Sequence, residues 1–252
     1  MENLVRVAVL MAVAGNLAMA QQSTITVIAP GGARAMLERM GPEFERATGN
    51  RIQATIGSGL GTKQDVAKGE VYDVAILQPP YPEVLASGNV VADSATPLAS
   101  VAVGVAVKKG GVRPDISTPE AVKRTLLGAK SIAYPDPTGG AAAGVSFDAT
   151  LRKLGIWEAV QPKLRRAQGG AGAMAMTARG EAEIGLTFLT EMQEPGVEVV
   201  GALPVEISTP TRLVGLIGTR AKDRTAAKAL LEFLASPGAA KVYRGLRMQP
   251  AR

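Results

Sequence analysis

Residues 24–47 read TITVIAPGGARAMLERMGPEFERA, and this stretch decides how the chain folds. The alternating pattern of Thr24–Ala29 predicts a β-strand, and the apolar spacing of Ala33–Ala47 predicts an amphipathic helix. Residues 30–32, PGG, join the two. A helix that begins in this way leaves backbone N–H groups free in its first turn, and such groups bind anions without a charged side chain. The stretch therefore predicts a strand, a tight turn and a helix that together offer a place for an anion.

The first twenty residues have the features of an export signal. Arg6 lies near the start, Val7–Ala14 is apolar, and the small residues of Ala18-Met19-Ala20 precede Gln21. The apolar run is too short to cross a bilayer. We expect cleavage after Ala20 and a periplasmic location for the mature protein.

Composition excludes several classes of chemistry. The 252 residues contain no cysteine and no histidine, which excludes a Ser-His-Asp triad, a cysteine nucleophile, a disulfide and a typical zinc site. The net charge is +6, and removal of the signal does not change it because one arginine and one glutamate leave together. The basic residues are scattered over the polar faces and ends of the expected helices. They indicate a solvated surface with mild steering of an anion, and no nucleic-acid partner.

Strand-length apolar runs alternate with amphipathic runs along the mature chain. This alternation predicts an α/β fold with largely parallel sheets. The expected strands are Thr24–Ala29, Arg51–Ile56, Asp73–Leu77, Ser100–Val107, Ser131–Tyr134, Ile184–Thr187, Val197–Gly201 and Arg212–Gly218. The expected helices are Ala33–Ala47, Pro82–Ala86, Pro119–Leu127, Ala143–Leu154, Ala171–Ala178, Asp223–Leu234 and Gly238–Arg244.

Four glycine-rich turns follow expected strands or open expected helices. Each alone is explained by the needs of a tight turn. Four together indicate one shared cleft, because open α/β sheets bind ligands at the carboxyl ends of their strands. The turns are residues 29–32 (APGG), 57–62 (GSGLGT), 136–144 (DPTGGAAAG) and 168–172 (QGGAG).

An ordered set of segments resembles the periplasmic molybdate-binding proteins of ABC importers. The set runs from Thr24 to about Leu246 and comprises ITV at 25–27, FERATG at 44–49, GSG at 57–59, DVAI at 73–76, AYPDP at 133–137, LGIW at 154–157, PKL at 162–164 and RGEAEIG at 179–185. The resemblance implies a two-lobed type II periplasmic-binding fold, each lobe a mostly parallel sheet flanked by helices. It places lobe 1 at residues 21–98 plus 208–252 and lobe 2 at residues 99–207, with the ligand cleft between them.

The resemblance also implies a divergent ligand site. Gly32 stands where the family has its first oxyanion-binding serine, and Phe188 stands where it has a tyrosine hydroxyl. Ser58 matches the second serine, and Ala143 and Gly170 fall at two helix-start amide positions. Each lost charge-assisted hydrogen bond weakens binding by roughly 1.5–3 kcal/mol, so we expect a ligand other than molybdate, such as a small organic anion. The candidate replacement donors are Thr62, Thr138, Thr187, Gln78 and Arg34.

We therefore expect a monomeric solute-binding protein that closes its lobes around a small anion and delivers it to an ABC permease in the inner membrane, with no cofactor and no metal. A module that presents its ligand to a membrane receptor is the alternative. We do not expect an enzyme, because Asp136 is the one candidate acid in these turns and orienting its loop explains it. The expected ligand-binding residues are Gly31, Gly32, Ala33, Arg34, Ser58, Gly59, Thr62, Thr138, Ala142, Ala143, Gly170, Ala171 and Phe188.

Overall fold

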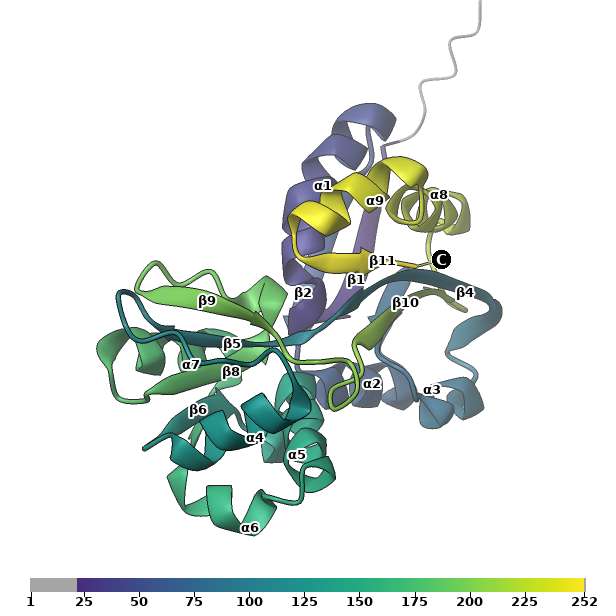
Figure 1. Ribbon diagram of the computed structural model, residues 1–252. Coiled ribbons are helices and arrows are strands. Elements are labelled where there is room, and N and C mark those ends of the chain that lie inside the picture. Colours follow the sequence, from purple (N-terminus) through teal and green to yellow (C-terminus); the bar gives the residue numbers. More distant parts are fainter. Residues whose placement is uncertain (1–21, 252) are drawn as a thin grey trace, which may run out of the picture.

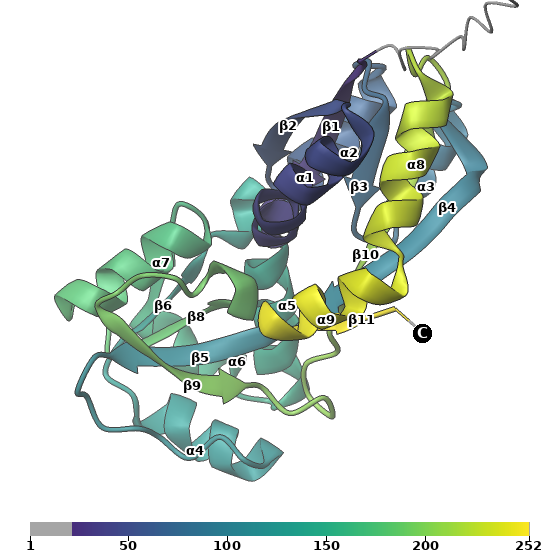
Figure 2. The same cartoon turned by 90° about the horizontal axis from the view of Figure 1, so that it is seen from above.

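The computed structural model describes residues 22–251 as two α/β lobes, each built on one sheet (Figures 1 and 2). The expected signal, residues 1–20, lies outside the described residues. No helix within residues 22–251 combines the length and the apolar character needed to cross a bilayer.

The first lobe holds a six-stranded sheet in the order β11-β4-β10-β3-β1-β2. Helices α1, α8 and α9 cover one face and α2 and α3 cover the other (Figure 1). Alternation along β1 explains this, since Ile25 and Val27 pack on the first side and Ile28 on the second. The strands are β1 Thr24–Pro30, β2 Arg51–Gly57, β3 Val74–Leu77, β4 Val90–Val101, β10 Thr211–Gly218 and β11 Met248–Pro250. The helices are α1 Arg34–Thr48, α2 Gly59–Lys68, α3 Pro82–Ser87, α8 Arg224–Leu234 and α9 Pro237–Gly245, with the short 3-10 turn η1 Gly31–Ala33 before α1.

The second lobe holds a five-stranded sheet in the order β7-β6-β8-β5-β9. Phe147 and Leu151 of α5 pack on the face that α4 and α6 also cover, and Met174 of α7 packs on the other. The strands are β5 Val103–Lys108, β6 Ile132–Pro135, β7 Leu164–Ala167, β8 Ile184–Phe188 and β9 Val197–Ala202. The helices are α4 Pro119–Gly128, α5 Ala142–Lys153, α6 Trp157–Val160 and α7 Gly169–Arg179, with 3-10 turns η2 Pro137–Gly139, η3 Gln161–Lys163 and η4 Leu189–Glu191.

The expectation of mostly parallel sheets is wrong, since both sheets are mixed. Strands pair in parallel where a helix returns the chain, as for β1 with β2 and β3, and for β6 with β7 and β8. The strands that carry the chain between lobes pair antiparallel: β10 with β3 and β4, and β5 with β8 and β9. These crossing strands follow no helical return within their sheet, so nothing forces them into parallel register.

The lobes are joined where β4 leaves the first sheet at Val101 and β5 enters the second at Val103. The chain returns between β9 and β10. Two hydrogen bonds also bridge the lobes directly. The N–H of Leu60 donates to the carbonyl of Gly140 at 3.2 Å, and the hydroxyl of Thr190 donates to the carbonyl of Gly32 at 3.4 Å. The lobes are thus closed on each other around the space between them.

Candidate functional site

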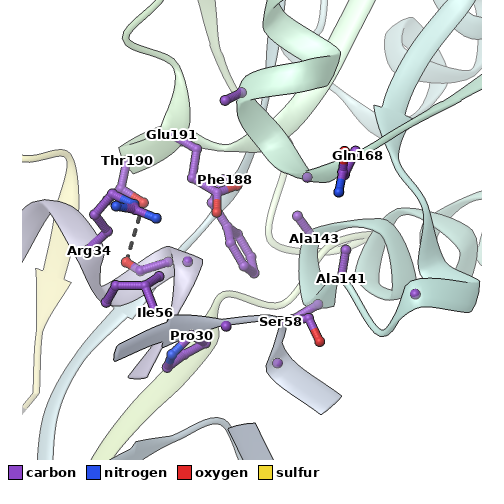
Figure 3. A pocket seen from close by; sticks show the side chains of 18 of the residues that line it. Pro30, Arg34, Ile56, Ser58, Ala141, Ala143, Gln168, Phe188, Thr190 and Glu191 are labelled. Carbon is purple, nitrogen blue, oxygen red and sulfur yellow. Dashed lines mark hydrogen bonds between the residues drawn. The ribbon is translucent and has the colours of Figure 1, made fainter. Parts of the chain in front are cut away.

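A cavity of about 920 Å³ lies between the lobes, at the carboxyl ends of the parallel strands (Figure 3). From the first lobe it is lined by the residues that end or follow β1, β2 and β3. From the second lobe it is lined by those that end or follow β6, β7 and β8. Each sheet therefore presents its loop edge to the same space, which is where open α/β sheets bind their ligands.

Three of the helices that begin at the cavity have no side-chain cap. The residues that precede α1, α5 and α7, namely Ala33, Ala141 and Gln168, make no capping hydrogen bond. Helix α2 differs, because Ser58 Oγ accepts from the N–H of Gly61 at 3.0 Å. First-turn amides that neither a side chain nor a preceding turn satisfies are available to an anionic ligand, which favours α5 and α7 over α1, whose Arg34 N–H donates to the carbonyl of Gly31.

Two arginines line the cavity from opposite lobes. Arg34 of α1 lies 3.7 Å from Glu38, and Arg166 of β7 lies 3.9 Å from Asp136. All four side chains are exposed, so each resident pair is weak and screened. The Asp136 carboxylate also accepts from the hydroxyl and the amide of Thr138, and these bonds hold its pKa below the ordinary range.

Glu191, the last residue of η4, extends its carboxyl group into the space between the lobes (Figure 3). The hydroxyl of Thr187 donates to its Oε2. Burial raises the pKa of Glu191, and this outweighs the opposing effects of the Thr187 hydroxyl, the Phe188 amide and the charge of Arg34. Glu191 is therefore an acid that can carry or release a proton inside the cleft.

Gln78 is a second buried polar side chain at the cavity. It follows β3, is 5% exposed, and neither its Nε2 nor its Oε1 has a hydrogen-bond partner among the described residues. A Cβ built on Gly59 would overlap the amide oxygen, so the amide lies against the start of α2. Buried amides are rarely left without partners, and this one can serve a bound ligand.

Most of the residues expected from the sequence line the cavity: Gly31, Gly32, Arg34, Ser58, Gly59, Ala142, Ala143, Ala171 and Phe188. The other four do not line it. Ala33 is fully buried, and Gly170 lies beneath the Glu191 carboxyl. The hydroxyl of Thr62 donates to the carbonyl of Ser58 at 2.8 Å, and that of Thr138 donates to Asp136.

Of the five expected replacement donors, Gln78 and Arg34 line the cavity. The hydroxyls of the three threonines donate to protein oxygens, and Thr187 donates to Glu191.

Gly32 and Phe188, the two positions at which the sequence was expected to depart from the molybdate-binding pattern, lie against each other. A Cβ built on Gly32 would lie 3.2 Å from Cδ2 of Phe188 and 3.5 Å from Val101. Such a contact is tight, so the phenyl ring occupies the room that a serine side chain at position 32 would need. Figure 3 shows the Phe188 ring in the middle of the cleft. Gly32 and Phe188 therefore fit together and form an apolar wall of the cavity.

Several cavity residues were not expected from the sequence. Glu191 lies four residues after the end of the expected strand Ile184–Thr187, so a search of the segments that follow strands finds it. Arg166 lies in β7, a strand that was not expected, and its charge was assigned to the solvated surface. The remaining unexpected polar residues are Glu38, Gln168, Thr190 and Gln193.

Comparison with known proteins shows the family. The family model described as "Bacterial extracellular solute-binding protein" matches residues 25–245. The chain is 32% identical to an aconitate isomerase from Pseudomonas sp. over 240 residues, covering 91% of this chain and 90% of the relative. It is 29% identical to the molybdate-binding protein ModA of Azotobacter vinelandii, covering 89% of each chain. The solved periplasmic molybdate-binding protein of Azotobacter vinelandii superimposes with a TM-score of 0.75 at 19% identity, covering 90% of this chain and 100% of that one. The chain belongs to the bacterial extracellular solute-binding proteins and shares the two-lobed fold of the molybdate-binding proteins.

Proposed function

We propose that this protein, after export and removal of residues 1–20, binds a small organic polycarboxylate between its lobes and delivers it to an ABC permease. The observation that carries the proposal is the presence of Arg34 and Arg166 on opposite walls of one cavity. A guanidinium group donates two parallel hydrogen bonds to a carboxylate, so two arginines suit a ligand with at least two carboxylates. Binding across the cleft also favours the closed arrangement of the lobes.

The rest of the cavity fits the same class of ligand. Its volume of about 920 Å³ is at the upper end of small-molecule sites and far exceeds what a four-oxygen anion fills. Ser58 keeps its own hydroxyl proton available while its oxygen caps α2, and Gln78 adds an unpartnered amide. The resident partners of both arginines are exposed and lie at 3.7 and 3.9 Å, so a ligand carboxylate can compete with them.

A thermal-shift panel on unfolded and refolded, ligand-free protein tests this proposal. The panel contains cis- and trans-aconitate, citrate, succinate, sulfate and molybdate. A polycarboxylate at about 100 times its Kd should raise the Tm by about 5–11 °C. Arg34→Ala and Arg166→Ala should each abolish most of the shift. Arg113→Ala is the matched control, because Arg113 pairs with Glu198 at 2.6 Å outside the cavity. A shift with molybdate and none with carboxylates would refute the proposal.

A second candidate function is isomerisation of the bound polycarboxylate, and Glu191 favours it. Among residues 22–251, Glu191 is the cavity acid with no basic side chain within 4.0 Å, whereas Glu38 and Asp136 are paired. The relative that is 32% identical is named aconitate isomerase. In such a reaction Glu191 takes a proton from a methylene carbon, and the electron pair of that C–H bond forms the new double bond. The electrons of the old double bond then take up the proton that Glu191 returns at the far carbon, so no oxidant or second reactant is needed.

Proton NMR in D₂O separates the two functions. Isomerisation would interconvert cis- and trans-aconitate and place deuterium on the methylene carbon, at a rate proportional to protein concentration. Glu191→Gln should stop both changes while the thermal shift remains. A protein that shifts with aconitate but never exchanges its protons is a binding protein alone.

A further inference from the structure

The carboxyl group of Glu191 lies between two glycines that belong to different lobes. A Cβ built on Gly31 would lie 2.6 Å from Oε1, and one built on Gly170 would overlap Oε2 and the hydroxyl of Thr187. Both glycines thus give room to this one side chain. Gly31 opens the turn before α1, and Gly170 lies in the first turn of α7.

The start of α7 is a favourable place for an anion. The helix is 11 residues long, and Gln168, which precedes it, forms no capping hydrogen bond. The N–H groups of its first turn and the helix dipole therefore favour a negative group at this end. The Glu191 carboxyl lies directly at this end, held by Thr187. A side chain of the protein itself thus lies beside the first-turn amides that suit a ligand oxyanion, and its carboxyl group accepts from Thr187.

Another part of the cavity carries the hydrogen-bonding groups that a ligand can use. Gln78 is 5% exposed and has an amide without a protein partner, and the cavity that it lines also holds Arg34 and Arg166. These groups offer donors to carboxylates and one acceptor to a hydroxyl or a protonated carboxyl.

We propose that Glu191 determines ligand class: its carboxyl group takes up the space beside the first-turn amides of α7, excludes tetrahedral oxyanions, and leaves the Gln78, Arg34 and Arg166 region to a carboxylate ligand. This deepens the proposed function and rests on it for the identity of the accepted ligand. The exclusion has two physical sources. The side chain occupies the space next to the helix amides, and a doubly charged anion placed there would meet a carboxylate.

Calorimetric titration of two Glu191 variants with molybdate and sulfate tests the exclusion. Glu191→Ala removes both the bulk and the charge, and should bind one of these anions at least 100-fold more tightly than the unmodified protein. Glu191→Gln keeps the bulk beside the helix amides and should gain less than tenfold. Glu232→Ala is the matched control, because it removes an exposed acid that is paired with Lys228 outside the cavity, and it should gain nothing.

The proposal is overturned if the unmodified protein binds molybdate or sulfate as tightly as Glu191→Ala does, or if Glu191→Ala gains no affinity. Glu191→Ser provides a second truncation should the alanine variant fail to fold, with circular dichroism as the check. Failure of the proposed function is a separate result, since it is the absence of polycarboxylate binding by the unmodified protein. Oxyanion binding gained by the truncated variant does not depend on that outcome.

Discussion

Among the helices of nine or more residues within residues 22–251, those away from the cleft begin with a side-chain cap, whereas three of the four at the cleft do not; the short helices α3 and α6, away from the cleft, also have no such cap. Helices α4, α8 and α9, none of whose residues line the cavity, each begin with a side-chain cap. Thr118, Asp223 and Ser236 accept from the amides of their first turns at 3.1, 2.9 and 3.2 Å. Helices α1, α5 and α7 begin at the cleft without a cap. A cap contributes about 1 kcal/mol, so α5 and α7 forgo that stability and leave first-turn amides without a side-chain partner. Helix α1 instead continues the turn η1, and its Arg34 N–H donates to the carbonyl of Gly31.

Helix α2 combines features of the two groups, because it begins at the cleft and yet has a side-chain cap. Ser58 caps it through the N–H of Gly61 at 3.0 Å, and the N–H of Leu60 donates to the carbonyl of Gly140 in the other lobe at 3.2 Å. Its first-turn amides thus hold the helix and the closed lobes together. Among the helices at the cleft, α2 uses first-turn amides to hold the lobes together, and the uncapped helices have amides that a ligand can bind.

We expect the largest effect when a cleft helix is given the side-chain cap that it lacks. Ala141→Asp places a carboxylate before α5, in extended backbone of φ −68° and ψ 113° that suits a capping residue. We expect the free energy of unfolding to rise by about 1 kcal/mol and the polycarboxylate affinity to fall at least 100-fold, because the new charge faces the ligand. Urea unfolding and calorimetric titration measure the two effects.

Ala141→Asn is the control for Ala141→Asp, since it caps without a charge and should lose less affinity. Affinity that stays unchanged in the aspartate variant would mean that the α5 amides take no part in binding.

The α/β class and the cleft could be predicted because they depend on local pattern. Strand-length apolar runs and the glycine turns that follow them are visible in the sequence, and the turns do lie at one edge. Helix α2 could not be predicted, because Gly57, Gly59 and Gly61 indicate a loop. In the structure Gly59 is needed where the lobes approach, since a Cβ there would lie 3.0 Å from the Cβ of Ala142. Contacts between distant segments therefore decided this helix against its local preference.

The other features that the sequence did not predict also depend on contacts between distant segments. Most of β4 was not expected, because residues 90–98 alternate only weakly and include Pro97; antiparallel pairing with β10 makes them a strand. The place of Glu191 between Gly31 and Gly170 depends on three segments far apart in the chain. Sequence pattern could find the loops that form the cleft, but not which side chains meet inside it.

A smaller effect on ligand affinity should distinguish the cap of a cleft helix from the cap of an outer helix. Ser58→Ala and Ser236→Ala each remove a serine that accepts from a first-turn amide, at 3.0 and 3.2 Å. Both should lower the free energy of unfolding by about 1 kcal/mol. Ser58→Ala should also weaken polycarboxylate binding about tenfold, because it removes a hydroxyl donor from the cavity, whereas Ser236→Ala should leave the affinity unchanged. Equal affinities of the two variants would show that Ser58 acts only as a cap.

The smallest effect concerns the pH dependence of an outer cap. Asp223 accepts from the N–H of Ala226 and from the hydroxyl of Ser23, and these bonds, the first above all, lower its pKa. The stabilisation that follows is complete above the unfolded pKa of about 3.9 and is lost as the pH falls through the lower, folded pKa. Asp223→Asn still caps α8 but does not titrate, so its unfolding free energy should fall less than that of the unmodified protein between pH 5 and pH 2, as measured by urea unfolding.

Glu191 should titrate in the opposite sense to Asp223. Because burial raises its pKa, the native state holds the proton more tightly than the unfolded chain does, and stability falls as the pH rises through that window. A carboxyl group on an outer helix therefore stabilises the fold when charged, whereas the carboxyl in the cleft destabilises it when charged. If the unfolding curve of Asp223→Asn has the same acid limb as that of the unmodified protein, outer caps contribute nothing through their charge, and the contrast with the cleft then depends on hydrogen bonding alone.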